Sequence, residues 1–291
     1  DPGPAIPNET VASVPRVGTA PMPNDAEMEQ LYKLATQWGV GTAQGQVQQS
    51  LFRLQEIGLP ALRWMIDRKL KGSDRLQNRA FATVVQGGDQ GCADFFGIEG
   101  RLLLAPKCAS ANLDEARNAI RISTDLRIEE SAPHVTAALK VPALQRLAAQ
   151  AAGPVKAREA IGDLIPLAAS PDRLLAIAAL ASMTEIADEQ ALPTGQALLG
   201  SSDLAIRKAA IALVAKFPDR ARTIAKQQMD SSDERLIRTG VELLAKVANE
   251  EDLTFLGRRL RDPRAGVKIS VMTALNGRVP ADHRADLAAL M

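Results

Sequence analysis

The chain has 291 residues, of which 49 are alanine, 35 are leucine and only nine are aromatic. Because strands favour β-branched and aromatic residues, whereas Ala and Leu lose little on entering a helix, this composition predicts an all-α fold and argues against a β-sandwich or barrel. The formal charge of +1, from 35 basic and 34 acidic residues, argues against bulk nucleic-acid binding and against a polybasic patch that binds membrane surfaces.

The first 25 residues contain six prolines and show little apolar periodicity. Such a composition buries too little apolar surface to fold, so residues 1–25 are predicted to form a disordered, Pro-rich linker. The chain begins at Asp1 rather than at a methionine, and a Pro-rich stretch in this place is typical of a processed export signal or a membrane tether. We therefore expect an extracytoplasmic protein, periplasmic or secreted, with a cytoplasmic location as the alternative.

Residues 26–169 follow helical spacing with only a weak repeat. The segments 26–38 and 44–57 are predicted to form a capping helical pair, with Trp38 and Trp64 in its core. We interpret the remainder as degenerate copies of a helical pair that recurs more clearly later in the chain. The weaker helical segments are 57–62, 73–82, 114–120 and 141–147.

An irregular insertion near residues 87–113 interrupts this helical pattern. It contains a Gly-Gly-Asp-Gln-Gly-Cys run, the adjacent Phe95 and Phe96, and both cysteines of the chain. Long loops in compact domains are often functional, so Phe95 and Phe96 are candidate site residues; the alternative is a structural flap that covers the flank of neighbouring helices. Cys92 and Cys108, with 15 residues between them, could close a local disulfide in an oxidising compartment or could be unrelated thiols.

A repeat of about 31 residues becomes clear over residues 170–291. Its basic residues Arg207, Arg238 and Lys268 are spaced by 31 and 30 residues, and Ala176 takes the equivalent place 31 residues before Arg207. In each copy, a helix that begins after Ser or Asp, both good N-caps, is followed by a short break and a second helix. The predicted first helices are 172–184, 203–216, 233–248 and 263–276, and the predicted second helices are 189–199, 219–229, 250–260 and 281–290.

These copies resemble the HEAT repeat family of helical-pair solenoids. The resemblance is carried by a polar turn, an aliphatic–basic step and a small residue, as at Asp203, Ile206-Arg207 and Ala210. One such pair cannot bury its apolar stripe alone, whereas stacking gives every pair a neighbour on each flank. The resemblance implies an all-α, right-handed α-solenoid of HEAT-like helical pairs over 26–291, with clear repeats over 170–291 and degenerate repeats over 26–169.

The same resemblance implies a ladder of bonds between turn acids and helix cations in neighbouring repeats. On this chain it would use Asp203 with Arg207, Asp233 with Arg238, and Asp262 with Lys268. Ala176 departs from the pattern, so the ladder should stop or change at that repeat.

The residues that most enzymes need are scarce in this sequence. His134 and His283 lie far apart, and neither has a His or Cys partner at metal-ligand spacing. The Gly-rich run at 87–91 lacks the Lys-Ser/Thr of a phosphate loop, and the paired carboxylates are adjacent, so they point to different faces of a helix. No run of 18 apolar residues is present to span a membrane. We therefore expect no catalytic site, no metal and no cofactor.

Basic residues cluster on two of the predicted second helices. By resemblance, second helices usually line the concave face of a HEAT-like solenoid, where such a patch could meet an acidic protein or a phosphate backbone. The candidate partner-binding residues are Arg220, Arg222, Lys226, Arg258, Arg259 and Arg261.

Three functions are compatible with these features. The leading hypothesis is a non-catalytic scaffold that presents a solenoid surface to a protein partner. The first alternative is a HEAT-like enzyme or small-ligand binder that uses the 87–113 insertion, and a deep pocket beside Phe95 and Phe96 would favour it. The second alternative is weak nucleic-acid binding through the basic C-terminal repeats, which the absence of a strong basic excess and of base-facing aromatics disfavours.

Overall fold

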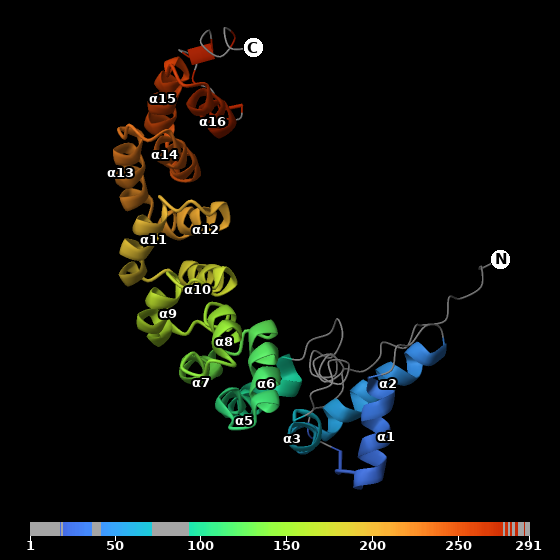
Figure 1. Ribbon diagram of the computed structural model, residues 1–291. Helices are drawn as coiled ribbons and strands as arrows, with labels where there is room; N and C mark the ends of the chain where they lie inside the picture. The colour runs from blue at the N-terminus through green and yellow to red at the C-terminus, as the bar shows by residue number, and fades with distance from the viewer. Residues whose placement is uncertain are drawn as a thin grey trace, which may run out of the picture. The chain divides into compact units, whose positions relative to one another are not determined.

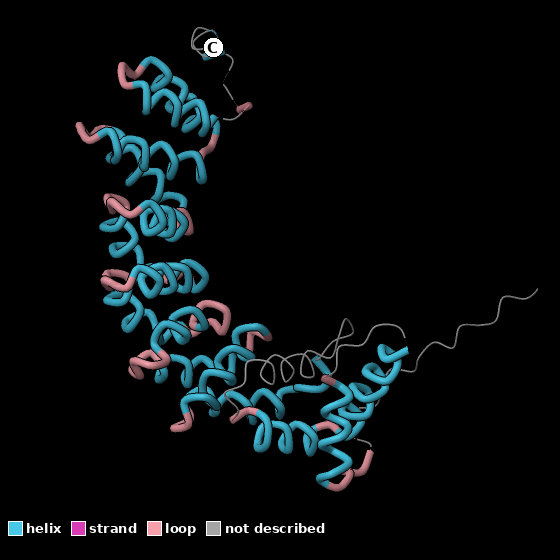
Figure 2. The backbone as a smooth tube through the Cα atoms, turned by 45° about the vertical axis from the view of Figure 1, so that its right-hand side comes forward, coloured by secondary structure: helices cyan, strands magenta, loops and turns pink. Residues whose placement is uncertain are grey.

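The computed structural model of the chain describes residues 18, 20–36, 42–71 and 93–275, together with scattered positions between 277 and 288. All regular secondary structure in these residues is α-helix or 3₁₀-helix (Figures 1 and 2), so the predicted fold class is confirmed. Most of the predicted linker 1–25 lies outside the described residues, although α1 already begins at Asp25. The contacts divide the chain into two compact units, Asp1–Ile122 and Ser123–Met291.

The first unit begins with a helical pair. Asn24 and Glu27 cap α1 reciprocally, each side chain bonding the backbone N–H of the other. Tyr32 on α1 packs on Trp64 of α3 with ring centroids 6.2 Å apart, and the Lys69 Nζ lies 5.1 Å from the Tyr32 ring centroid. Trp38, the other predicted core tryptophan, lies outside the described residues. The helices of this unit are α1 (Asp25–Ala35), α2 (Thr42–Ile57), α3 (Leu59–Lys69), α5 (Ala93–Leu104) and α6 (Leu113–Asp125), which runs on past residue 122.

The predicted insertion differs from expectation where it is described. Residues 93–104 form α5, and a 3₁₀ helix follows at Ala105–Ala109. A run of leucines favours the continuation of α5 to Leu104. Pro106 lacks an N–H, so it would interrupt α5 but fits in the first turn of the 3₁₀ helix that follows. Cys108 is a buried thiol in this structure, so the Cys92–Cys108 disulfide is not supported; Cys92 lies outside the described residues.

The second unit is a stack of helical pairs. Figure 1 shows its later first helices on one side of the stack and its second helices on the other. In the clear repeats, the described bounds agree with the predicted ones to within two residues, except that α11 begins three residues late because a 3₁₀ turn, Glu189–Ala191, precedes it. The predicted helix 281–290 lies mostly outside the described residues. The first helices are α8 (Gln145–Ala151), α10 (Arg173–Ile186), α12 (Leu204–Val214), α14 (Glu234–Val247) and α16 (Ala265–Leu275). The second helices are α7 (Ala132–Ala138), α9 (Ile161–Leu167), α11 (Leu192–Leu198), α13 (Pro218–Met229) and α15 (Glu250–Arg258).

Aspartate side chains start the first helices of the clear repeats. The Asp172 Oδ1 accepts the backbone N–H groups of Leu174 and Leu175, and the Asp203 Oδ1 accepts those of Ala205 and Ile206. Asp233 caps α14 in the same way through the Arg235 N–H. These bonds satisfy donors that have no partner inside the helix, which is why the polar turns recur at the repeat period.

A left-handed residue recurs between the first and second helices of three consecutive repeats. Arg127, Lys156 and Ala187 have φ angles of 52°, 53° and 55°, and each precedes a 3₁₀ turn that opens a second helix. In the first two, the next residue donates five positions back, Ile128 N to Ser123 O at 2.9 Å and Ala157 N to Ala152 O at 2.8 Å. The repeat therefore extends back before residue 170 in its turn geometry.

Close approach between α13 and α14 joins the two layers of the stack. A Cβ placed on Gly240 would lie 2.7 Å from the Ala225 carbonyl oxygen and 2.9 Å from the Met229 Cγ. The apolar face of α14, with Ile237 and Val241 fully buried, packs into the core that these helices share with α16. Small residues at the crossing thus let the larger aliphatic residues interdigitate.

Replacing Gly240 with alanine should therefore destabilise the second unit. The added methyl group must displace the backbone of α13, so Gly240→Ala should lower the free energy of unfolding by about 1–3 kcal/mol in a urea titration followed by circular dichroism. Gly162→Ala is the matched control, because nothing lies within 4 Å of its added Cβ on α9. That control should leave stability unchanged or raise it by up to about 1 kcal/mol.

Candidate groove on the first helices

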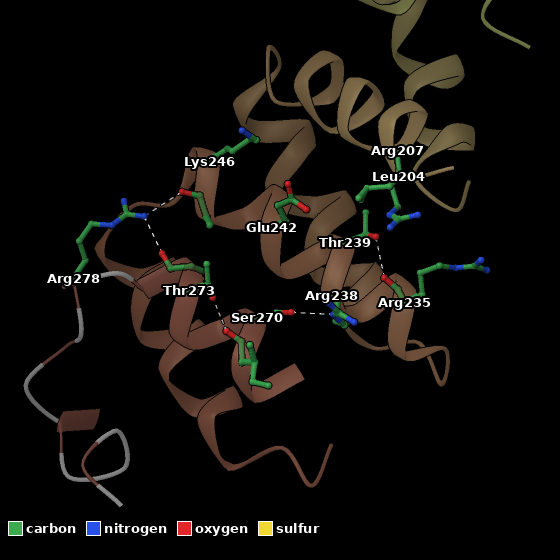
Figure 3. A pocket seen from close by; sticks show the side chains of 13 residues that line it. Leu204, Arg207, Arg235, Arg238, Thr239, Glu242, Lys246, Ser270, Thr273 and Arg278 are labelled. Carbon is green, nitrogen blue, oxygen red and sulfur yellow. Dashed lines mark hydrogen bonds between the residues drawn. The ribbon is translucent and has the colours of Figure 1, made fainter. Parts of the chain in front are cut away.

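A groove of about 560 Å³ lies on the first-helix layer of the last three repeats (Figure 3). Helices α12, α14 and α16 form its walls, and Arg278, which follows α16, closes one end. We call it the first-helix groove. The residues that line it are Leu204, Arg207, Arg235, Arg238, Thr239, Glu242, Ala245, Lys246, Ile269, Ser270, Thr273, Ala274 and Arg278.

The charged side of the groove comes from a polar stripe on α14. Arg238, Glu242 and Lys246 are spaced by four residues, so they project along one face of the helix. The opposite stripe of α14 is apolar and buried in the core, which fixes the rotation of the helix and turns the charged stripe outward. The close-up shows these side chains directed toward the groove from α14 (Figure 3).

Three arginines of the groove are held by neutral acceptors. The Arg207 Nη1 donates to the Ser201 carbonyl at 2.6 Å, and the Arg238 Nε donates to the Ser270 Oγ at 3.1 Å. The Arg278 Nη2 donates to the carbonyls of Ala245 and Ala274 at 3.3 and 3.2 Å. Because these acceptors carry no net charge, each guanidinium is positioned while its positive charge remains uncompensated.

The other charges of the groove add to this imbalance. Arg235 is the one lining cation that pairs with a described carboxylate, Asp233, at 3.3 Å between exposed atoms. Lys246 and Glu242 take part in no ion pair among the described residues. Among the described lining residues, four cations without a carboxylate partner therefore face Glu242 across an open groove, which gives the groove a positive potential.

Two large aliphatic side chains border the same groove. Leu204 at the start of α12 is 53% exposed, and Ile269 on α16 is 62% exposed. Leu174 on α10 is exposed to a similar extent, at 55%, but it does not line the groove. Exposed aliphatic side chains beside uncompensated cations are typical of a surface that binds a partner.

The basic residues predicted to bind a partner lie on the other layer, and several are neutralised there. The Arg222 Nε lies 3.1 Å from the Asp252 Oδ2, and the Lys226 Nζ lies 2.7 Å from the Asp252 Oδ1. Asp252 is 1% exposed and also forms a reciprocal cap with Asn249 at the start of α15. This carboxylate thus ties α13 to α15.

Of the remaining predicted basic residues, one forms an ion pair and three are exposed to solvent. Arg259 pairs with Asp230 at 3.0 Å, and its guanidinium lies 5.6 Å from the Phe255 ring centroid. Arg220, Arg258 and Arg261 are exposed. The structure therefore brings Arg222 and Lys226 together around a buried acid and places none of the six predicted residues in the first-helix groove.

The ladder implied by the resemblance has other partners in the structure. Asp203 pairs with Arg173 of the preceding repeat at 2.5 Å, which lowers the pKa of its carboxyl, while Arg207 bonds a carbonyl in the groove. Asp233 and Asp262 pair with the arginines two residues on, Arg235 and Arg264. The N-cap geometry explains the change, because one carboxylate oxygen faces the helix N-terminus and the other meets an arginine in the first turn or the preceding repeat. Arg238 bonds Ser270, and Lys268 forms no ion pair with a described residue.

The predicted insertion supplies a polar turn in its described part. The Ser110 hydroxyl donates to Glu115, and the Lys107 Nζ lies 3.2 Å from the Glu115 Oε1, so these residues close the turn before α6. Phe95 and Phe96 lie on α5, but their side chains are outside the described part of the structure. Among the described residues, no group of His, Cys, Asp and Glu has the arrangement of a metal site. None of the described helices is long and apolar enough to cross a membrane.

The groove residues were not found from the sequence. Arg207 and Arg238 were assigned there to a structural ladder, and Glu242, Lys246 and Arg278 were not singled out. The available signal is the four-residue spacing of charges on α14, a pattern that an ordinary solvated helix face also shows.

Comparisons with known proteins give only distant similarities. No model of a protein family and no curated protein matches this chain. The chain is similar to a structure of the complex of CpcE and CpcF of phycocyanin lyase from Nostoc sp. PCC7120, at 18% identity over 60% of this chain and 75% of that chain, with a TM-score of 0.42. It is also similar to human deoxyhypusine hydroxylase in complex with glycerol, at 14% identity over 86% of this chain and 95% of that chain, with a TM-score of 0.33. The function is therefore inferred from the groove itself.

Removing the buried Asp252 carboxylate should destabilise the stack more than removing an exposed one. Asp252→Asn leaves Arg222 and Lys226 without their shared carboxylate, so we expect a loss of about 2 kcal/mol in urea unfolding. Asp219→Asn is the matched control, because Asp219 also pairs with Arg222 at 2.7 Å but is 97% exposed. Its loss should stay below about 1 kcal/mol, and equal losses in the two variants would contradict the role of Asp252.

Asp262, in the turn before α16, should make stability depend on pH in acid. Arg264 holds the pKa of Asp262 at about 2, below the ordinary value of about 4 in the unfolded chain. The ionised carboxyl therefore stabilises the folded state above about pH 5, and this contribution falls as the pH drops from about 4 through 2. Relative to Asp262→Asn, the wild type should lose on the order of 2 kcal/mol over that window, measured by urea unfolding at a series of pH values. A difference that stays constant down to about pH 2 would contradict this assignment.

Proposed function

We propose that this chain is a non-catalytic binding module that presents a solenoid surface to a protein partner. The binding surface in this proposal is the first-helix groove on α12, α14 and α16. The observation that carries it is the way in which the groove cations are held. Arg207, Arg238 and Arg278 are fixed by carbonyl and hydroxyl oxygens, so their charges remain to be met by a ligand.

The contrast with the second-helix layer supports this choice of surface. There, Arg222, Lys226 and Arg259 meet carboxylates of their own chain, and Asp252 joins two helices of the stack. Those cations serve the packing of the repeats, whereas Arg207, Arg238 and Arg278 bond no described carboxylate. Helical-pair solenoids commonly bind partners on the extended surfaces that stacked helices create.

A peptide selection tests the proposal without assuming the identity of the partner. A random peptide library displayed on phage would be selected on the full chain, and each enriched peptide would be synthesised and its dissociation constant measured by fluorescence anisotropy. The double variant Arg238→Glu/Lys246→Glu should raise the dissociation constant at least about ten-fold, because a hydrogen-bonded charge contact is lost at each position.

The matched control carries the same change of charge on the second-helix layer. Arg220→Glu/Arg258→Glu replaces two exposed cations outside the groove, so the dissociation constants should stay within about two-fold of wild type. Circular dichroism melting would verify that both variants are folded. Selection of no peptide, or of peptides that bind the groove variant as well as the wild type, would overturn the proposal.

A further inference from the structure

The charges of the first-helix groove are arranged in an order that selects a ligand. One end holds Arg207 and Arg238, the other holds Lys246 and Arg278, and Glu242 lies between them on α14. From Arg238 to Lys246 is eight residues of one helix, which corresponds to about 12 Å along its axis. The groove thus presents positive, negative and positive charge in sequence.

The two positive ends are rigid in different ways. Arg238 is held from α16 by the Ser270 hydroxyl, which itself donates to the Gly266 carbonyl at 2.9 Å. Arg278 is held by carbonyls of both α14 and α16, so it keeps its place relative to Lys246 on α14. Side chains positioned in this way lose little conformational freedom when a ligand binds, which favours affinity.

We infer that the first-helix groove binds an extended, acidic peptide segment with two carboxylates four residues apart and a hydrogen-bond donor between them. This inference rests on the proposed function and names the class of partner. Four residues of extended chain span about 13 Å, close to the separation of the two cationic ends, whereas carboxylates four residues apart on a helix lie only about 6 Å apart. The donor of the central ligand residue faces Glu242, which forms no ion pair with a described residue.

The aliphatic borders of the groove complete the ligand pattern. Leu204 and Ile269 are more than half exposed and lie near Arg207 and Arg238, so aliphatic residues beside the acid that meets this end would cover them. A nucleic-acid strand fits this surface less well. No aromatic side chain is among the described residues that line the groove, so a base has none to stack on there, and Glu242 would repel a phosphate backbone. A segment of protein meets both the charges and the aliphatic borders.

Synthetic peptides test the inference directly. The probe is a fluorescent peptide of sequence Leu-Glu-Ala-Gln-Ala-Glu-Leu, and its binding to the full chain is measured by anisotropy. One comparison peptide has Gln in place of both Glu residues, and another has the same composition with the two Glu residues adjacent. The spaced acidic peptide should bind at least about ten-fold more tightly than either, and its affinity should fall as ionic strength rises from about 0.05 M to about 0.3 M.

A charge exchange identifies the contact. Lys246→Glu should weaken the spaced peptide at least about ten-fold, and a peptide with Lys in place of its second Glu should bind this variant better than it binds the wild type. Lys246→Gln should weaken binding of the acidic peptide without strengthening binding of the Lys peptide. Arg220→Glu, outside the groove, should change neither dissociation constant by more than about two-fold.

Each contrary outcome has a distinct meaning. Three outcomes would overturn the inference that the partner is an acidic peptide. They are equal affinity for the neutral and the spaced acidic peptide, no binding of the spaced acidic peptide, and no change of peptide preference in Lys246→Glu. Groove-dependent peptides without an acidic pair from the library selection would overturn it as well, yet would leave the proposed binding function intact. A single-stranded oligonucleotide that binds more tightly than the spaced peptide, and that loses affinity in Lys246→Glu, would replace the peptide by a nucleic acid.

Discussion

The second unit depends on the burial of one apolar stripe on each first helix. On α14 this stripe includes Ile237, Val241 and Leu244, all without exposed surface, and it packs against α13 and α16. Burying aliphatic side chains of this size contributes about 1.5–3 kcal/mol each, more than any exposed ion pair in the stack. Gly240 permits this burial, because its missing side chain lets the backbone of α13 approach. Once the stripe is buried, the rotation of α14 about its own axis is fixed, so its polar face must point away from the core.

The two layers of the stack use basic residues in different ways as a result. On the second helices, the buried Asp252 gathers Arg222 and Lys226, so charge serves cohesion between successive repeats. On the first helices, carbonyl and hydroxyl groups hold arginines without neutralising them. A buried carboxylate must be paired to persist, whereas an exposed guanidinium needs no acidic partner because water solvates its charge. This difference is why we propose the first-helix groove, and not the second-helix layer, as the binding surface.

Much of the fold could be predicted from residues that recur at the repeat period. Asp172, Asp203 and Asp233 act as N-caps where the polar turns predict them, and helices α10 to α15 begin and end within two residues of expectation, apart from the start of α11. The earlier repeats are harder to recognise because Arg127 and Lys156 adopt left-handed backbone where glycine or asparagine would be the usual signal. The helical part of the predicted insertion was missed because its glycines weakened the helical pattern around Leu102–Leu104.

The sequence by itself determined that this chain is helical, that its helices come in pairs and that the pairs stack, because caps and apolar spacing are local properties of the chain. It also showed which residues are charged, but not which charges are compensated. Arg207 was expected to bond Asp203 and instead bonds the Ser201 carbonyl, while Asp203 pairs with Arg173 thirty residues away. Only the tertiary structure decided that question, because compensation depends on distances between side chains of different repeats, and the packing of the helices sets those distances.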